Sequence, residues 1–298
     1  MTQPVLAFIT RDSETKMSQT PVSLFNVLYS TLQIPYKDII LVDDSKDCTI
    51  NVFKNFSAKY GKKLLVRTGA GNRAKARQKA IDLFLTKFEG YEWILFVDDD
   101  VIFKPGWWKE ANEHMCNPKN GLLWGINHDG IGDRPLWYKF RGMDTIEILK
   151  NDFWKRGGTH DTLIRRDALE GCVIPEELHV FEDWYILKYV LAKGYFAQIM
   201  DVGVTHYNPY YAGDIIRARL NAYLDVKYEI SNSRSDHHYR FYRLIRNIFS
   251  LPLHIIINIK VFGFKEGFKR GVFRWMILLN FRVFTIFYSI KFLLKEKK

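Results

Sequence analysis

Three consecutive acidic residues, Asp98, Asp99 and Asp100, follow a short run of bulky apolar residues, Trp93 to Val97. A run of this length and bulk predicts a buried central strand, and open α/β sheets bind ligands at the carboxyl ends of such strands. Adjacent carboxylates repel one another unless a cation neutralises them, and hard divalent ions accept such oxygen ligands beside substrate phosphates. Three acids in isolation would more simply form a solvated turn.

A second acidic pair, Asp43 and Asp44, follows a second apolar run, Asp38 to Val42. Parallel neighbouring strands end at the same edge of a sheet, so both sets of carboxylates are expected at one edge. Two such strands favour a single nucleotide-sugar site over an isolated acidic turn.

The first half of the chain alternates strand-like and helix-like segments. We expect strands at Val5–Thr10, Asp38–Val42, Lys63–Arg67 and Trp93–Val97, with helices at Pro21–Leu32, Thr49–Tyr60 and Arg73–Lys87. This alternation predicts an α/β fold in which helices cover both faces of a mainly parallel sheet. The turn Gly69–Asn72 could hold a phosphate at a helix N-terminus. It lacks the full G-x-G-x-x-G spacing, so a dinucleotide site is only weakly indicated.

The second half is less regular and very aromatic between Pro135 and Arg156. We expect strands at Gly121–His128 and Thr159–Arg165, a helix at Val180–Ala192, and a short strand pair at Phe196–Met200 and Val202–His206. Glu182 and Asp183 lie in the first turn of that helix, where the helix dipole alone would favour them. Gly157-Gly158 could allow a close approach to a donor sugar or simply form a turn.

Taken in order, these motifs resemble those of GT-A glycosyltransferases of the inverting family 2, from about residue 4 to residue 208. ILVDDSKD is similar to the family's V-D-D-G-S-x-D, and Ala76-Arg77 to its A-R pair. FVDDD resembles the D-x-D element, FEDWYILKYVLAKGY the E-D-x-x-L…G-Y helix, and VTHYN carries a histidine where many members have one. The chain departs from the pattern by lacking the glycine before Ser45 and by carrying Asn72 and Gln78.

The resemblance implies a GT-A, Rossmann-like catalytic domain and a role for each matching residue. The implied nucleotide-binding residues are Thr10, Asp43, Asp44, Arg77, Asp98 and Asp99. Asp98, Asp100 and His206 would hold Mn²⁺ or Mg²⁺. Asp183 would be the general base, with Glu182 beside it at the catalytic site.

The net charge of +11 lies entirely in the C-terminal part of the chain. Residues 234–298 contain 14 Lys and Arg against 3 Asp and Glu, whereas residues 1–233 contain 30 of each kind. We therefore predict a catalytic domain at residues 1–233 and a basic tail of amphipathic helices at residues 234–298. Three scattered cysteines and the shortness of Val5–Ile9 argue against a disulfide framework and a signal peptide, which favours a cytosolic catalytic part.

The basic tail admits several partners. Its residues between the charges are more apolar than a nucleic-acid-binding arm requires, and Arg282 interrupts the apolar run that a spanning helix needs. On a helical projection one half is basic and the other apolar. The basic half contains Arg270, Arg274, Arg282, Lys291 and Lys295; the apolar half contains Val272, Met276, Leu279, Val283, Ile286, Ile290 and Leu294. This pattern favours a helix at an anionic membrane surface, although packing on the domain or on a second copy of the chain stays open.

These observations predict an inverting, metal-dependent glycosyltransferase peripheral to the cytoplasmic side of the cell membrane. It would move a sugar from a nucleotide-diphosphate donor to a lipid-linked glycan or polyisoprenyl phosphate. Two alternatives stay open: a soluble enzyme that extends free or protein-bound glycans, and a GT-A-shaped scaffold without turnover.

Overall fold

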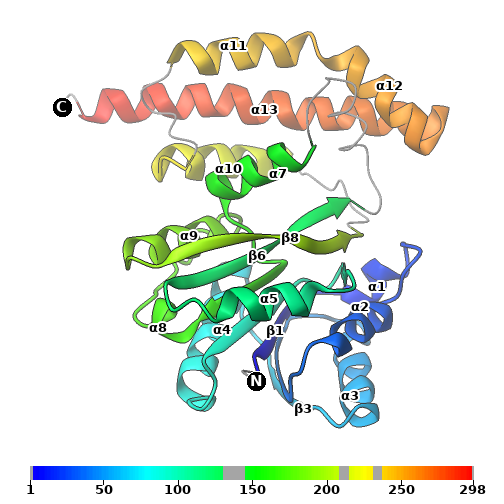
Figure 1. Ribbon diagram of the computed structural model, residues 1–298. Helices are drawn as coiled ribbons and strands as arrows, with labels where there is room; N and C mark the ends of the chain where they lie inside the picture. Colours follow the sequence, from blue (N-terminus) through cyan, green and yellow to red (C-terminus); the bar gives the residue numbers. More distant parts are fainter. Residues whose placement is uncertain (1–2, 130–144, 208–214, 231–236, 297–298) are drawn as a thin grey trace. The chain divides into compact units, whose positions relative to one another are not determined.

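The computed structural model describes residues 3–129, 145–207, 215–230 and 237–296 (Figure 1). Contacts divide the chain into two compact units. Unit 1 comprises residues 1–131 and 146–209, and unit 2 comprises residues 132–145 and 210–298. The boundary that we predicted between residues 233 and 234 lies outside the described residues, as does most of the aromatic stretch before residue 145. A functional division at that point therefore stays a prediction.

Unit 1 is built on one eight-stranded sheet in the order β3-β2-β1-β4-β7-β6-β8-β5. The strands are β1 (Val5–Thr10), β2 (Asp38–Asp43), β3 (Lys63–Arg67), β4 (Trp93–Val97), β5 (Val101–Phe103), β6 (Asn120–Asp129), β7 (Asp161–Arg165) and β8 (Phe196–His206). The first four are parallel, β7 runs antiparallel to β4 and β6, and β6 pairs with β8 in parallel. The predicted α/β fold with a mainly parallel sheet is confirmed.

Helices cover both faces of this sheet because side chains alternate along its buried strands. The helices of unit 1 are α1 (Ser13–Met17), α2 (Leu24–Ser30), the 3₁₀ turn η1 (Thr31–Gln33), α3 (Thr49–Lys59), α4 (Arg73–Lys87), α5 (Trp107–Met115), α7 (Thr145–Arg156), α8 (Arg166–Leu169) and α9 (Glu182–Ala192). Val5 and Ala7 of β1 face one core, which α4 and α9 cover. Leu6 and Phe8 face the other, which α2, α3 and α5 cover.

The predicted strand pair at residues 196–206 is wrong, because β8 is one continuous strand. Its register shifts opposite Ile126, where Gly125 pairs with Met200 but Asn127 pairs with Val204. The extra residues of β8 form a bulge. The Glu110 carboxylate accepts hydrogen bonds from the backbone N–H groups of Asp201 and Val202 at 2.7 Å each. These two N–H groups of the bulge are therefore bonded to a side chain instead of to a neighbouring strand.

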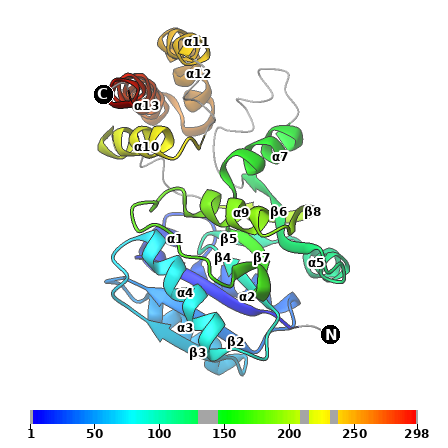
Figure 2. The same ribbon diagram turned by 90° about the vertical axis from the view of Figure 1, so that its left-hand side faces the viewer.

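Unit 2 contains four described helices, α10 (Ile215–Lys227), α11 (His237–Ile248), α12 (Leu251–Phe262) and α13 (Phe264–Glu296). Figure 2 views α11 and α13 nearly end-on, with α10 and α12 beside them. Gly267 and Gly271 face α12 so closely that a Cβ on Gly267 would lie 2.4 Å from the carbonyl oxygen of Asn258. Small residues at this spacing let the two backbones approach one another.

Helix α13 is long and apolar enough over Phe264–Phe292 to cross a membrane, with a mean hydropathy of 1.3. We expected no spanning helix because Pro252 and His254 lie in the uncharged stretch 247–259 and Arg282 interrupts the next one, but the length and composition of α13 do not exclude a span. One such helix is weak evidence for a membrane span. Only 11% of the apolar stretch of α13 that meets this criterion is buried within the structure.

Candidate functional site

The three acidic residues after β4 turn toward three different partners. Oδ1 of Asp98 lies 3.7 Å from Nη2 of Arg77, and its backbone N–H donates to the carbonyl of His160 at 3.0 Å. Asp99 accepts a hydrogen bond from Ser13 and lies 3.8 Å from Nζ of Lys16. Burial alone would raise the pKa of Asp98, but the guanidinium groups of Arg77 and Arg73 outweigh it and lower this pKa. Burial and the Asp100 carboxylate raise the pKa of Asp99 to about 6.

Asp100 and His206 form the part of the site that best fits a metal ion. Oδ1 of Asp100 lies 2.8 Å from Nε2 of His206. This oxygen is buried, and within the described chain no group donates a well-aligned hydrogen bond to it. A carboxylate and an imidazole are suitable ligands for Mn²⁺, and the carboxylate also for Mg²⁺. No cluster of three His, Cys, Asp or Glu side chains in the described ranges could hold a metal by itself. Substrate phosphates would have to supply the remaining ligands.

Arg77 is a buried cation with unused donors. Its side chain is 2% exposed, and Nη2 donates to Oγ1 of Thr159 at 2.8 Å. Its guanidinium also lies over the Phe96 ring, 4.6 Å from the centroid. Nε and Nη1 are buried and have no hydrogen-bond partner among the residues that the structure describes. Because such orphaned donors cost free energy, Arg77 is suited to bind an anionic or hydroxyl-bearing ligand.

Glu182 and Asp183 begin helix α9, as predicted, and Glu182 is linked to the same cation. Oε1 of Glu182 lies 4.0 Å from Nη2 of Arg77 and 3.6 Å from Nε of Arg73. Burial, together with the neighbouring Asp183 carboxylate, raises the pKa of Glu182 to about 8. Burial also raises the pKa of Asp183. Near neutral pH the pair therefore holds a proton on Glu182, while Asp183, which is partly exposed, can act as a base.

Asp43 and Asp44 organise loops as well as lining the predicted nucleotide site. Asp43 is buried and accepts hydrogen bonds from Thr10 and from Oγ of Ser45. Asp44 accepts three backbone N–H groups of the turn at residues 69–71, at 2.7, 3.0 and 2.6 Å. The Asp44 carboxylate therefore takes three of the N–H groups that a phosphate in this turn would use, and the phosphate-binding role of the turn stays a prediction. Burial would raise the pKa of Asp44, but these three donors outweigh it and lower this pKa.

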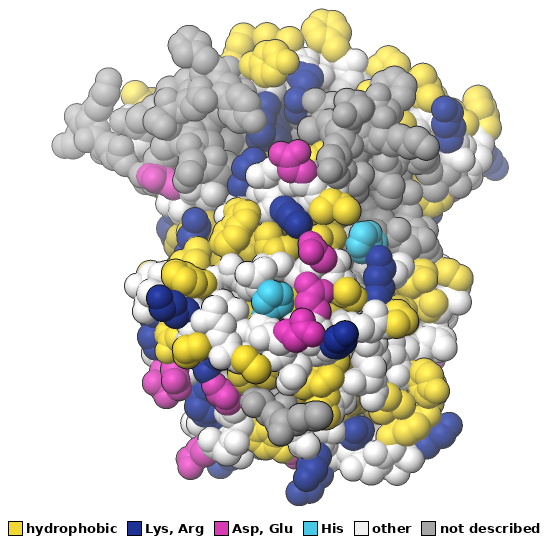
Figure 3. Space-filling view, viewed as in Figure 1, with side chains coloured by type: hydrophobic (Ala, Val, Ile, Leu, Met, Phe, Trp, Pro, Cys, Tyr) yellow, Lys and Arg dark blue, Asp and Glu magenta, His cyan; other side chains and the backbone are white. Residues whose placement is uncertain are grey.

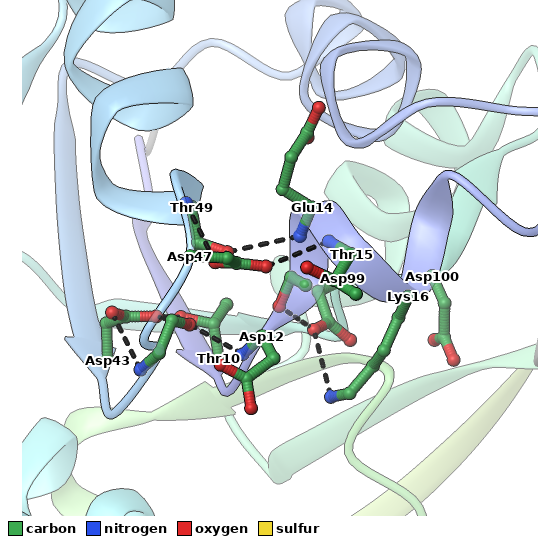
Figure 4. Close-up of polar contacts among 12 residues, drawn as sticks. Thr10, Asp12, Glu14, Thr15, Lys16, Asp43, Asp47, Thr49, Asp99 and Asp100 are labelled. Carbon is green, nitrogen blue, oxygen red and sulfur yellow. Dashed lines mark hydrogen bonds and ion pairs between the residues drawn. The ribbon is translucent and has the colours of Figure 1, made fainter.

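Helix α1, which the sequence did not predict, is held by the loop before α3 (Figure 4). The backbone N–H of Thr15 donates to Asp47 at 2.8 Å, and that of Glu14 donates to Thr49 at 3.1 Å. Ser13 and Lys16 of the same helix contact Asp99. The α1 turn thus joins the acidic strand end of β2 to that of β4.

A buried pair, His160 and Asp161, also lies in the site and was missed by the sequence argument. Asp161 accepts a hydrogen bond from Nε1 of Trp107 at 2.8 Å, and its Oδ1 lies 2.7 Å from Nδ1 of His160. Nε1 of Trp124 donates to Nε2 of His160 at 3.1 Å. The His160 and His206 rings lie 5.9 Å apart. No motif marks these residues, because only the pairing of β7 with β4 and β6 brings them beside the acidic turn.

Gly157 and Gly158 are required by packing around this site. A Cβ on Gly157, whose φ is +72°, would lie 2.4 Å from the backbone oxygen of Asp183. A Cβ on Gly158 would lie 2.4 Å from Nε1 of Trp124. We left open whether these glycines form a turn or allow a donor sugar to approach closely. Their close contacts give a physical reason for glycine in a turn.

The structure joins the predicted residues into smaller groups. Arg77 connects Asp98 to Glu182, which adjoins Asp183, whereas Asp100 pairs with His206. Asp98, predicted as a metal ligand, is turned toward Arg77 instead of His206. Thr10 and Asp43 are both buried, and Thr10 donates a hydrogen bond to Asp43, so their side chains join the ends of β1 and β2.

Comparisons with known proteins agree with this architecture. Residues 18–172 match the model of glycosyl transferase family 2. The mannosyltransferase PcManGT from Pyrobaculum calidifontis, solved with GDP-Man and Mn²⁺, has a TM-score of 0.57 at 14% identity, over 99% of this chain and 88% of that one. S. aureus TarS residues 1–349 have a TM-score of 0.52 at 16% identity, over 97% and 92% of the two chains.

A second TarS structure, in complex with UDP, has a TM-score of 0.50 at 17% identity over the same shares of the two chains. At these identities the likeness to solved structures is one of fold. No curated protein matches the sequence.

Proposed function

The chain belongs to glycosyl transferase family 2, and on that premise we propose that it is an inverting, metal-dependent enzyme that uses a nucleotide-diphosphate sugar. The observation that carries the proposal is the pairing of Asp100 with His206 in the same unit as the Arg77, Glu182 and Asp183 cluster. Structures of similar fold hold GDP-Man with Mn²⁺, or UDP. These ligands support a nucleoside diphosphate and a divalent ion as partners of this site.

Asp100 and His206 are the residues that would hold Mn²⁺ or Mg²⁺, with Asp98 nearby. Such an ion stabilises the negative charge that develops on the leaving nucleoside diphosphate. Arg77 adds a buried positive charge with two donors that the described residues do not satisfy, and these suit oxygen atoms of the donor. Together these groups favour departure of the diphosphate from the anomeric carbon.

Asp183 is the residue that we propose takes the proton of an attacking hydroxyl group. It lies at the start of α9, and Glu182 beside it keeps a proton to about pH 8. A protonated Glu182 removes one negative charge from the site next to Asp183. A phosphate acceptor is already ionised and would not need this base.

The acceptor that we propose is a lipid-linked glycan or polyisoprenyl phosphate at the cytoplasmic face of the membrane. The support is the arrangement of unit 2, whose helices bury polar side chains and expose apolar ones. His254, Asn258, Thr285 and Ser289 are 4%, 1%, 3% and 1% exposed. The exposed apolar residues of α13 are Phe264, Phe268, Phe273, Met276, Val283, Phe287, Ile290 and Leu294.

Helix α11 adds to this apolar surface. Phe241 and Tyr242 are 59% and 60% exposed, and Phe249, just after the helix, is 77% exposed. Figure 3 shows hydrophobic side chains over the outer edge of α11 and α12, with Lys and Arg side chains beneath them. Exposed apolar residues on several helices, with basic residues beside them, suit an anionic lipid surface better than a single protein partner.

Turnover tests the catalytic proposal. The full chain with Mn²⁺ should release nucleoside diphosphate from its donor, and Asp183→Asn should reduce transfer to a hydroxyl acceptor by about a hundredfold or more. Glu176→Gln, a change at an exposed acid paired with Lys75, serves as the control. A scaffold without turnover would release none. Parental transfer by Asp183→Asn would remove this residue from the mechanism or indicate an ionised acceptor.

Liposome flotation tests the membrane proposal. The full chain should float with anionic vesicles and stay bound in high salt, because apolar insertion is not screened. The double variant Phe273→Ser, Phe287→Ser should float only at low salt, and residues 1–233 alone should stay in solution. Equal flotation of all three proteins would contradict the proposal. Self-association of the full chain without vesicle binding would favour a homo-oligomer instead.

A further inference from the structure

Asn127 lies directly after the point where β6 meets the bulge of β8. The bulge brings the two backbones so close that a Cβ on Gly203 would lie 1.8 Å from the carbonyl oxygen of Ile126. Only glycine permits that approach, so the irregular register is fixed by packing. Beyond it the side chain of Asn127, in a residue only 8% exposed, lies against His206.

The side-chain amide of Asn127 uses its nitrogen to contact His206, while its oxygen has no hydrogen-bond partner among the described residues. Nδ2 of Asn127 lies 3.0 Å from Nδ1 of His206, while Nε2 of the same ring lies 2.8 Å from Asp100. The amide N–H can donate to Nδ1 only if the ring carries its proton on Nε2, the nitrogen nearest Asp100, although that contact is not a well-aligned hydrogen bond. Oδ1 of Asn127 is buried and has no hydrogen-bond partner in the part of the chain that the structure describes.

A metal ion at Asp100 would require the opposite form of the ring. Nε2 can bind a cation only through its lone pair, so the proton must then lie on Nδ1. A histidine that binds a metal usually donates this second N–H to an oxygen atom, which orients the ring. The unused oxygen of Asn127 would take that hydrogen bond if the amide turned by about 180° about its terminal bond.

We propose that Asn127 is a positioning residue that serves both forms of His206. Its amide N–H donates to Nδ1 in the metal-free protein, and its oxygen accepts from Nδ1 when His206 binds the cation. The inference rests on the proposed metal site of Asp100 and His206. It also supplies a partner for the buried oxygen of Asn127, which has none among the described residues.

Binding of Mn²⁺ to the full chain in the presence of UDP, GDP, CDP or dTDP, followed by electron paramagnetic resonance of the free ion and compared with the same nucleotide without protein, tests the proposal. Asn127→Leu keeps the volume but offers no hydrogen bond, and it should weaken Mn²⁺ binding by about 10–100-fold. Asn127→Asp keeps an acceptor and should bind within about threefold of the parent. His206→Ala is measured beside them and should lose this binding. Circular dichroism of the metal-free proteins checks that each is folded.

Nuclear magnetic resonance of ¹⁵N-histidine in the parent protein gives a readout that needs no variant at Asn127. The His206 ring should carry its proton on Nε2 in the metal-free protein and on Nδ1 after addition of Cd²⁺, a diamagnetic substitute for Mn²⁺. Binding of the ion through Nε2 requires this exchange, so the measurement tests the two forms of the ring, and the variants at residue 127 test the part played by Asn127. A ring with its proton on Nδ1 in both states would overturn the proposal.

The variants separate failure of this inference from failure of the metal site. If Asn127→Leu binds Mn²⁺ as well as the parent while His206→Ala does not, the role of Asn127 is wrong and the metal site stands. If the parent and His206→Ala bind Mn²⁺ equally or not at all, the metal site is wrong, and the role of Asn127 is overturned with it.

Discussion

Replacing Glu182 by glutamine should make the protein more stable at alkaline pH. Burial raises the pKa of Glu182 from 4.5 to about 8. The folded protein therefore holds a proton that the unfolded chain releases above about pH 4.5. The contribution of Glu182 to the free energy of unfolding is therefore most favourable below that pH, falls as the pH rises toward 8, and stays low above it. Glutamine cannot ionise, so the variant avoids this loss.

The size of the effect follows from the two pKa values. The difference, about 8 minus 4.5, is about 3.5, which corresponds to at most about 5 kcal/mol at ~1.36 kcal/mol for each pKa unit. Arg73 and Arg77 lose an anionic partner in the variant, and this offsets part of the gain. We expect a net gain of a few kcal/mol above pH 8, or roughly 5–10 °C in Tm.

Thermal unfolding of the full chain, followed by circular dichroism at several pH values, measures the effect. The Tm difference between Glu182→Gln and the parent should be small near pH 4.5 and largest near pH 9. Glu176→Gln should show no such trend, since the Glu176 side chain is 73% exposed. A Glu182→Gln protein that is no more stable than the parent at pH 9 would refute a buried, protonated Glu182.

Two further changes test the packing around the site. Gly203→Ala should lower the free energy of unfolding by at least about 1–3 kcal/mol, because its Cβ would overlap the Ile126 backbone. Gly90→Ala, whose Cβ would meet nothing within 4 Å, should change this free energy little when both variants are unfolded in urea. An equal effect of the two substitutions would contradict the close packing at the bulge. Trp107→Phe removes a donor to the buried Asp161 and should cost about 1–3 kcal/mol. Burial raises the pKa of Asp161, and the Trp107 donor lowers it, so this loss should be greater at a pH where Asp161 is ionised than at a lower pH where it is protonated; a pH-independent loss would indicate packing alone.

The strand ends of the site could be predicted because each is preceded by a local apolar run. The apolar composition of Trp93–Val97 alone predicted a central strand with the three aspartates at its end, and the structure shows this strand fully buried. Helix α9 was equally clear, because its apolar residues recur at helical spacing after Glu182 and Asp183. Short-range patterns of this kind are sufficient to predict the α/β fold and the positions of most of the acidic residues at its strand ends.

The remaining features depend on contacts between distant residues. Helix α1 has only five residues, and two of its N–H groups donate to Asp47, just before α3, and to Thr49, the first residue of α3. The alternation of β8 is interrupted by its bulge, which led us to predict two strands. Asn127 and His160 carry no motif and gain a role only through strand pairing. In unit 2 the half-buried Arg274 and Arg282 and the buried Thr285 and Ser289 show polar side chains turned inward, which a helical projection cannot reveal.

Binding of the nucleotide should depend on a metal ion held by Asp100. The most direct measurement is the Tm of the full chain with UDP, GDP, CDP or dTDP, each with and without Mn²⁺. At least one diphosphate should raise the Tm only when Mn²⁺ is present, and Asp100→Asn, although folded, should not respond. No shift with any diphosphate and Mn²⁺, or an equal shift without the metal or in Asp100→Asn, would contradict the claim.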